Sequence, residues 1–110
     1  MKPGVELHGV GYNNVTLTAG NNSMTLISYL NNSAAYASNF VVENLTLSAN
    51  GKTNCTGIAL MGSDTSHRLN DVKINNSTFN GAFNTGNNGF AYSLNANNGA
   101  GYTEQFFGNK

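Results

Sequence analysis

The sequence predicts an all-β solenoid of roughly four coils, because one short strand motif recurs along its 110 residues. The motif is an amide or carboxylate followed by apolar, polar and apolar residues. It begins at Asn14, again at Asn44 and a third time at Asp71, so it recurs at similar but unequal intervals. Its two apolar positions share one face, because strand side chains alternate with period two. A strand that recurs at such intervals is typical of stacked coils.

The composition favours strands and turns over helices. The chain has 21 Asn and 13 Gly residues, which tolerate left-handed backbone conformations and mark tight turns. Five Tyr, six Phe and recurrent β-branched residues argue against disorder, although only 9% of the residues are charged. No apolar pattern of helical period is present. We therefore expect a packed fold built from short strands.

Alternation and turn residues predict the strands in order. They are expected at residues 5–7, 15–17, 25–29, 40–42 running into 45–47, 57–60, 72–74, 77–79 and 90–94. Asn-Gly pairs are strong hairpin signals, but the recurring motif argues against an antiparallel meander. A second series, at residues 57–60 and 89–92, recurs at a similar interval. Two interleaved series predict more than one strand per coil.

The whole chain, residues 1–110, is predicted to be a single solenoid segment. Its last stretch of about 15 residues is expected to be an irregular tail or one that packs against a partner chain. No amphipathic helix precedes the first strands to cover the end of the stack. Roughly four coils also bury little apolar area against the entropy of ordering the chain. We therefore expect a fragment of a longer solenoid, stabilised by neighbouring sequence and by oligomerisation.

Charge and apolar content exclude several partners. The formal net charge is zero and no basic stripe is present, so no nucleic acid is expected. An anionic membrane surface is disfavoured on the same ground. No apolar run approaches the length of about 20 residues that a membrane span needs. Cys55 is the only cysteine, which excludes an intrachain disulfide, and it is expected to be a small buried residue at a strand start.

Four stretches carry a resemblance to a known family. Residues 2–11, 40–51, 56–60 and 69–74 resemble, in order, successive coils of the pectate-lyase-like superfamily, and the likeness covers residues 2–94. The resemblance implies a right-handed parallel β-helix. Members include secreted polysaccharide lyases and hydrolases, and the trimeric tailspikes with which bacteriophages bind and cut bacterial surface glycans. The Asn- and Gly-rich, charge-poor composition is most similar to a tailspike.

The resemblance therefore implies a segment of a homotrimeric tailspike in the virion tail that binds a bacterial surface polysaccharide. Whether the full-length protein also depolymerises that polysaccharide, as a lyase or as a glycoside hydrolase, is left open. One alternative is a non-catalytic structural or adhesive β-helix on a bacterial surface. Another is a secreted polysaccharide lyase, which would be extracellular.

One loop is the candidate catalytic segment. Asp64, His67 and Arg68 lie within five residues between two expected strands, where functional residues tend to gather. Asp64 offers an acid or base for glycan cleavage, and Arg68 offers a bidentate grip on a sugar carboxylate. The competing interpretation is a solvated turn with an incidental ion pair. Three other acids are expected to be structural or solvated: Glu6, Glu43 and Asp71.

Aromatic residues supply the candidate sugar platforms, because a ring with a polar tip suits a sugar face. Tyr92 and Tyr102 are the predicted substrate-binding residues, and Tyr36 is a further candidate. His8 and His67 are too isolated in the sequence to predict a metal pair, and no cofactor is expected.

Overall fold

The computed structural model describes residues 1–11, 14–33, 35–81, 83, 90–95 and 104–110. These residues form an all-β fold with twelve strands and no helix. The strands are β1 (Glu6–His8), β2 (Val15–Thr18), β3 (Thr25–Asn31), β4 (Tyr36–Ala37), β5 (Phe40–Glu43), β6 (Leu45–Ser48), β7 (Thr56–Gly62), β8 (Arg68–Leu69), β9 (Val72–Asn75), β10 (Thr78–Asn80), β11 (Phe90–Asn95) and β12 (Glu104–Phe107).

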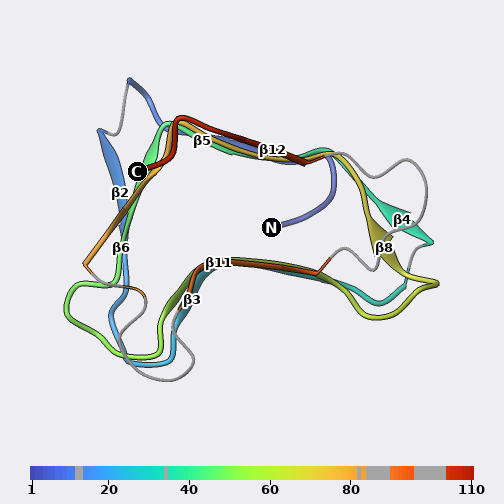
Figure 1. Ribbon diagram of the computed structural model, residues 1–110, viewed down its shortest axis with the longest axis horizontal. Coiled ribbons are helices and arrows are strands. Elements are labelled where there is room, and N and C mark those ends of the chain that lie inside the picture. The colour runs from blue at the N-terminus through green and yellow to red at the C-terminus, as the bar shows by residue number, and fades with distance from the viewer. Residues whose placement is uncertain (12–13, 34, 82, 84–89, 96–103) are drawn as a thin grey trace.

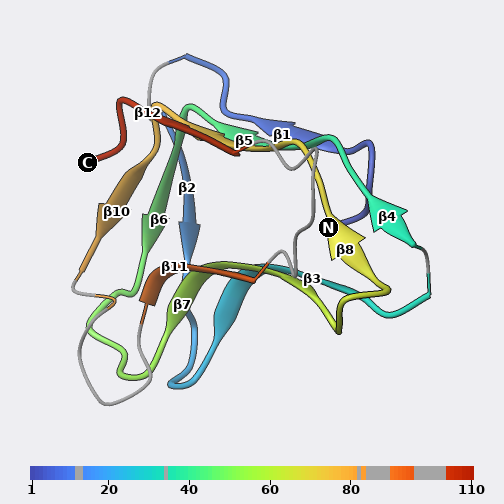
Figure 2. The ribbon, with the colours of Figure 1, turned by 45° about the vertical axis from the view of Figure 1, so that its right-hand side comes forward.

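The strands form four parallel sheets. Sheet A has the order β1-β5-β9-β12, sheet B β2-β6-β10, sheet C β3-β7-β11 and sheet D β4-β8. Strands that follow one another in the chain lie in different sheets, so the chain passes through the sheets in the same order on each circuit (Figures 1 and 2). The predicted all-β class is confirmed. The Asn-Gly pair at residues 50–51 closes a turn between two sheets and forms no hairpin.

The sequence offset between register partners differs from sheet to sheet. Val15 pairs with Leu45 in sheet B, whereas Glu6 pairs with the more distant Val41 in sheet A. Connections of unequal length absorb this drift. The predicted alignment of residues 57–60 with residues 89–92 is wrong by two positions, because Ile58 pairs with Tyr92. A shift by two keeps every side chain on its own face, which is why the pattern concealed it.

Left-handed residues bend the chain at both ends of the sheet A strands. Asn44 (φ 57°) ends β5 and begins β6, whereas Asp71 (φ 50°) leads into β9. The motif at residues 71–74 therefore belongs to sheet A, whereas those at residues 14–17 and 44–47 belong to sheet B. Positive φ explains why short polar or Gly residues recur there. The residues are Gly4, Asn39 and Asp71 before the strands, and Asn44, Asn76 and Gly108 after them.

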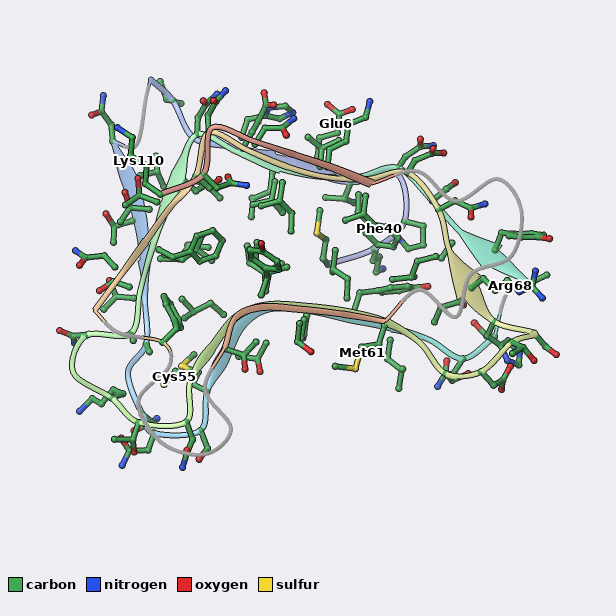
Figure 3. All side chains as sticks on the ribbon, viewed as in Figure 1. Glu6, Phe40, Cys55, Met61, Arg68 and Lys110 are labelled. Carbon is green, nitrogen blue, oxygen red and sulfur yellow. The ribbon has the colours of Figure 1, made fainter. Side chains whose placement is uncertain are left out.

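The apolar core lies between the sheets. In β5, Phe40 and Val42 are fully buried, while Val41 and Glu43 on the opposite face are partly exposed. Figure 3 shows Phe40 pointing into the interior and Met61 and Arg68 pointing outward. Burying a side chain of this size contributes about 1.5–3 kcal/mol. Other large, fully buried side chains are Leu45, Leu47, Ile58, Leu60, Leu69, Val72 and Ile74.

Three strands were not predicted. β4 and β8 have two residues each, too few to show alternation. β12 lies in the stretch expected to be an irregular tail, and it pairs in parallel with β9. Residues 96–103 of that stretch lie outside the described residues.

Two further expectations from the sequence concern Cys55 and the membrane. Cys55 is fully buried directly before β7, which confirms its predicted place, and its Sγ lies 3.4 Å from the carbonyl oxygen of Asn21. Over the part of the chain that the structure describes, no helix has the length and apolarity needed to cross a membrane.

Candidate functional site

The loop between β7 and β8 is closed by the Asp64 carboxylate. Its Oδ1 accepts a hydrogen bond of 2.7 Å from the backbone N–H of Ser66, and its Oδ2 accepts one of 3.3 Å from the Ser63 hydroxyl. His67 Nδ1 lies 2.9 Å from Oδ1 and 3.0 Å from Oδ2. The backbone N–H of His67 also donates to the Asp64 carbonyl. All of these partners are close neighbours in the sequence, so they form a local turn.

Those hydrogen bonds set the protonation state of Asp64. The contact with His67 and the backbone N–H of Ser66 lower the pKa of the Asp64 carboxyl below its ordinary value. A carboxyl with a lowered pKa is ionised at neutral pH and holds no proton to donate to a glycosidic oxygen. It is also a weaker base than an unperturbed carboxylate. The geometry therefore gives Asp64 the properties of a turn-closing residue.

Hydrogen bonds hold both the backbone and the side chain of Arg68 in place. Its backbone N–H donates to the carbonyl of Ala35, and its carbonyl accepts a 2.9 Å hydrogen bond from Nδ2 of the fully buried Asn31. Its Nε donates to the carbonyl of Thr65 at 2.5 Å. None of the carboxylates among the described residues forms an ion pair with this guanidinium. Arg68 thus presents an anchored cation at the surface (Figure 3).

Tyr36 lies beside Arg68. The two residues are register partners in sheet D, and their neighbours Ala37 and Leu69 are buried. Because side chains alternate along a strand, Tyr36 and Arg68 share the outward face, on strands about 4.8 Å apart. Tyr36 is 56% exposed. An exposed ring and an anchored guanidinium on paired strands can offer stacking area and a bidentate anion contact on one face.

Of the two predicted sugar-platform residues, only Tyr92 is among the described residues. Tyr92 lies in β11 in register with the fully buried Ile58, so it belongs to an inward-facing row. It is 44% exposed, and its ring packs edge-on against Phe79 with centroids 5.8 Å apart. Tyr92 is exposed because β11 is an end strand of sheet C, and not because its side chain lies on the outer face. Tyr102 lies outside the described residues.

A second cluster, which the sequence did not predict, lies on the outer face of sheet A. His8 Nε2 is 2.9 Å from Oε2 of Glu6, and His8 Nδ1 is 2.7 Å from Oε1 of Glu43. The side chains of His8, Glu6 and Glu43 are 43%, 60% and 28% exposed. Glu6, labelled in Figure 3, points away from the interior. Hydrogen bonding to Glu6 and then to Glu43 raises the pKa of His8 above its ordinary value.

This cluster depends on the pairing of β1 with β5. His8 and Glu43 are 35 residues apart and register partners. The sequence held a signal for it: the turn residues Gly4 and Gly9 enclose four strand positions, as Asn39 and Asn44 do. Aligning these two four-residue stretches places His8 beside Glu43.

Gly9 has a steric reason to be glycine. A Cβ atom added there would lie 1.9 Å from the carbonyl oxygen of Asn44. This close approach is part of the backbone that brings β1 against β5, because the Gly9 N–H donates to the Glu43 carbonyl at 3.0 Å.

Two other features carry less chemistry. Within the described residues, no group of three His, Cys, Asp or Glu side chains is placed to hold a metal ion. A hollow of about 280 Å³ opens beside the first strands of sheets A, B and C, and it is mainly apolar. It is lined by Met1, Val5, Leu7, Leu17, Leu26, Ile27 and Ser28.

Comparisons of this chain with protein-family models, with curated protein sequences and with solved structures give no match. What the protein does is therefore inferred from the residues and geometry described above.

Proposed function

We propose that the four parallel sheets are faces of a right-handed parallel β-helix, of which these residues are a segment. The constant order of the sheets and the parallel pairing of strands from successive circuits support this fold. In Figure 1 the chain runs counter-clockwise from β5 through β6 to β8, and the later, redder strands lie nearer the viewer. That combination is the right-handed sense, which parallel crossover connections adopt almost without exception.

We propose further that this segment binds a bacterial surface polysaccharide as part of a homotrimeric bacteriophage tailspike in the virion tail. The observation that carries the binding function is the Tyr36–Arg68 pair on the outward face of sheet D. The Asn- and Gly-rich, charge-poor composition and the family resemblance support the tailspike assignment. A glycan that carries carboxylates is the ligand that suits the pair best.

The chemistry of the pair explains this preference. The exposed Tyr36 ring offers an apolar face for the C–H groups of a sugar ring, with a hydroxyl at its edge. The Arg68 guanidinium is fixed through Nε, so its terminal N–H groups can meet a carboxylate with little further loss of conformational entropy. A hydrogen bond to a charged group contributes about 1.5–3 kcal/mol.

Binding is proposed here in preference to cleavage by the same loop. Hydrolysis of a glycoside requires one carboxyl that is protonated and another that is ionised. Asp64 is held ionised by its turn hydrogen bonds, and no second carboxylate shares its contacts within the described residues. His67 is engaged with the same carboxylate. The loop therefore supports recognition, with Asp64 shaping the turn that positions Arg68.

The test is a binding titration of the full chain against a purified capsular polysaccharide that contains uronic acid, with a neutral glucan as reference. Arg68→Gln and Tyr36→Ala are each expected to weaken binding about tenfold or more, which corresponds to about 1.4 kcal/mol. Lys73→Gln is the matched control, because it removes one cation from the outer face of sheet A. Wild-type affinity in both site variants, or an equal loss in Lys73→Gln, would refute the assignment.

Two further measurements test the remaining parts of the proposal. Light scattering on the full chain is expected to give the mass of three copies, and the mass of one copy would contradict the trimer. Incubation with the polysaccharide is expected to release no oligosaccharides through this loop. Release that is lost in Asp64→Asn, with binding retained, would show that Asp64 is catalytic.

A further inference from the structure

The contacts of His8 constrain its protonation state through geometry alone. A neutral imidazole carries one N–H donor, whereas an imidazolium carries two. Both ring nitrogens of His8 lie within hydrogen-bond distance of a carboxylate oxygen, at 2.9 Å and 2.7 Å. Ionised carboxylates only accept hydrogen bonds. Both contacts are therefore hydrogen bonds at the same time only when His8 is protonated.

The cluster joins separate circuits of the chain. Glu6 and His8 lie on β1, the end strand of sheet A, and Glu43 lies on its neighbour β5. Charged groups reach His8 from both strands, Glu6 from β1 and Glu43 from β5. On the next strand, β9, the nearest outward-facing cation is Lys73. Lys73 is the register partner of Val41, and Val41 is the register partner of Glu6, so Val41 lies between the two charged residues. Among the described residues, no ion pair connects Lys73 with either glutamate.

We propose that Glu6, His8 and Glu43 form a pH-sensitive clasp, which fastens β1 to β5 while His8 is an imidazolium and loosens when His8 loses its proton. After deprotonation, one of the two carboxylates faces a nitrogen lone pair instead of a donor. The contact between the strands then rests on the backbone hydrogen bonds and on the apolar inner face. The clasp is independent of polysaccharide binding, because it lies on sheet A and the Tyr36–Arg68 pair lies on sheet D.

The direction of the pH effect follows from linkage. The two carboxylates raise the pKa of His8, by hydrogen bonding to Glu6 first and to Glu43 second. For a group whose pKa is raised by folding, the stabilisation is fully present below the ordinary histidine value of about 6.5. It is lost as the pH rises through the raised pKa. The attachment of β1 is therefore expected to weaken as the pH rises above the ordinary histidine value of about 6.5.

Two equivalent backbone contacts provide an internal control. The N–H of Gly9 donates to the Glu43 carbonyl across β1 and β5, and the N–H of Asn44 donates to the Asn75 carbonyl across β5 and β9. Only the first contact crosses between the two strands that the clasp joins. The ratio of hydrogen-exchange protection factors at Gly9 and Asn44 therefore reports on the clasp and cancels the general effect of pH on exchange.

The experiment is NMR on the full chain from about pH 5.5 to about pH 9, which spans the ordinary and raised histidine range. His8 is expected to titrate above its ordinary value, and the Gly9-to-Asn44 ratio is expected to fall through the same pH range. The fall should approach tenfold for each unit by which the pKa is raised. In Glu43→Gln the His8 pKa should move toward its ordinary value, while Asp64→Asn, the matched control at His67, should leave it unchanged.

Three results would overturn the clasp. One is a His8 pKa at or below its ordinary value in the wild type. The second is a Gly9-to-Asn44 ratio that does not vary with pH. The third is a ratio that varies equally in His8→Asn. The first two are read from the wild-type protein, so the test stands even where a variant fails to fold.

Discussion

Two histidine–carboxylate pairs on this protein differ in what they connect. Asp64 and His67 are three residues apart and close a single turn between β7 and β8. His8 and Glu43 are 35 residues apart and bridge two strands of sheet A. The distances between their atoms are similar, at 2.9 Å and 2.7 Å. The first pair needs only local chain geometry, whereas the second exists only when β1 and β5 are in register.

The two pairs therefore depend on different kinds of order: the Asp64–His67 pair on local chain geometry, and the His8–Glu43 pair on long-range packing. A turn that its own side chains close can form while the rest of the chain is loosened. A contact between circuits reports on the packed interior that holds the strands together. Perturbations of that interior should therefore affect the His8 clasp and leave the Asp64 turn intact.

The largest effect is expected from the interior. Phe40 is fully buried, and its ring lies 5.0 Å from that of Tyr29, so Phe40→Ala should reduce the free energy of unfolding by about 3–5 kcal/mol. In whatever fraction remains folded, the His8 pKa should move toward its ordinary value. Urea unfolding measures the first quantity and NMR the second. Val41→Ala on the opposite face of β5 is the control, and an equal loss there would contradict the proposed interior.

An intermediate effect is expected at the corner that follows Glu43. Asn44 has φ 57°, a left-handed conformation that β-branched residues rarely adopt. Asn44→Val should cost about 1–2 kcal/mol of unfolding free energy, whereas Asn44→Gly should cost much less. Urea midpoints of the two variants provide the comparison. Equal destabilisation by valine and glycine would mean that the backbone at this corner is not left-handed.

The smallest effect is expected at the Asp64 turn. Because the pKa of Asp64 is lowered in the folded protein, its stabilisation is present above the ordinary aspartate value of about 3.9. It is lost as the pH falls through the lowered pKa. The urea midpoint of Asp64→Asn should therefore fall less steeply than that of the wild type as the pH drops below about 5. At neutral pH the variant lacks the stabilisation of the ionised carboxylate and should be slightly less stable, although the Asn oxygen can still accept the Ser66 hydrogen bond. A fall as steep as that of the wild type would refute this role.

Local patterns predicted much of the fold. Alternation located the strands that have four or more residues before residue 96, because burying one face imposes period two. The class and parallel pairing followed from recurrence. The Asp64–Arg68 loop was also visible, because its residues are adjacent in the sequence. Its chemistry was not, because the turn hydrogen bonds that ionise Asp64 depend on backbone geometry.

Register was the information that the sequence did not provide reliably. Left-handed corners occur at both ends of the sheet A strands, so Asn44 and Asp71 looked equivalent although they lead into different sheets. The His8 cluster was missed for the same reason, since Glu43 meets the local pair of Glu6 and His8 only once the register of β1 and β5 is known. The Tyr36–Arg68 pair also requires the register of β4 and β8.

The register between circuits is tested most directly by an engineered disulfide. Thr16 and Thr46 are partners on the outward face of sheet B, and neighbouring strands lie within the Cα separation that a disulfide tolerates. In a Cys55→Ser background, Thr16→Cys with Thr46→Cys should form an intrachain disulfide on mild oxidation. Thr18→Cys with Thr46→Cys, displaced by two residues, should not. Efficient cross-linking of the displaced pair, with none in the paired positions, would contradict the parallel stacking of successive circuits, on which both the proposed clasp and the proposed binding site depend.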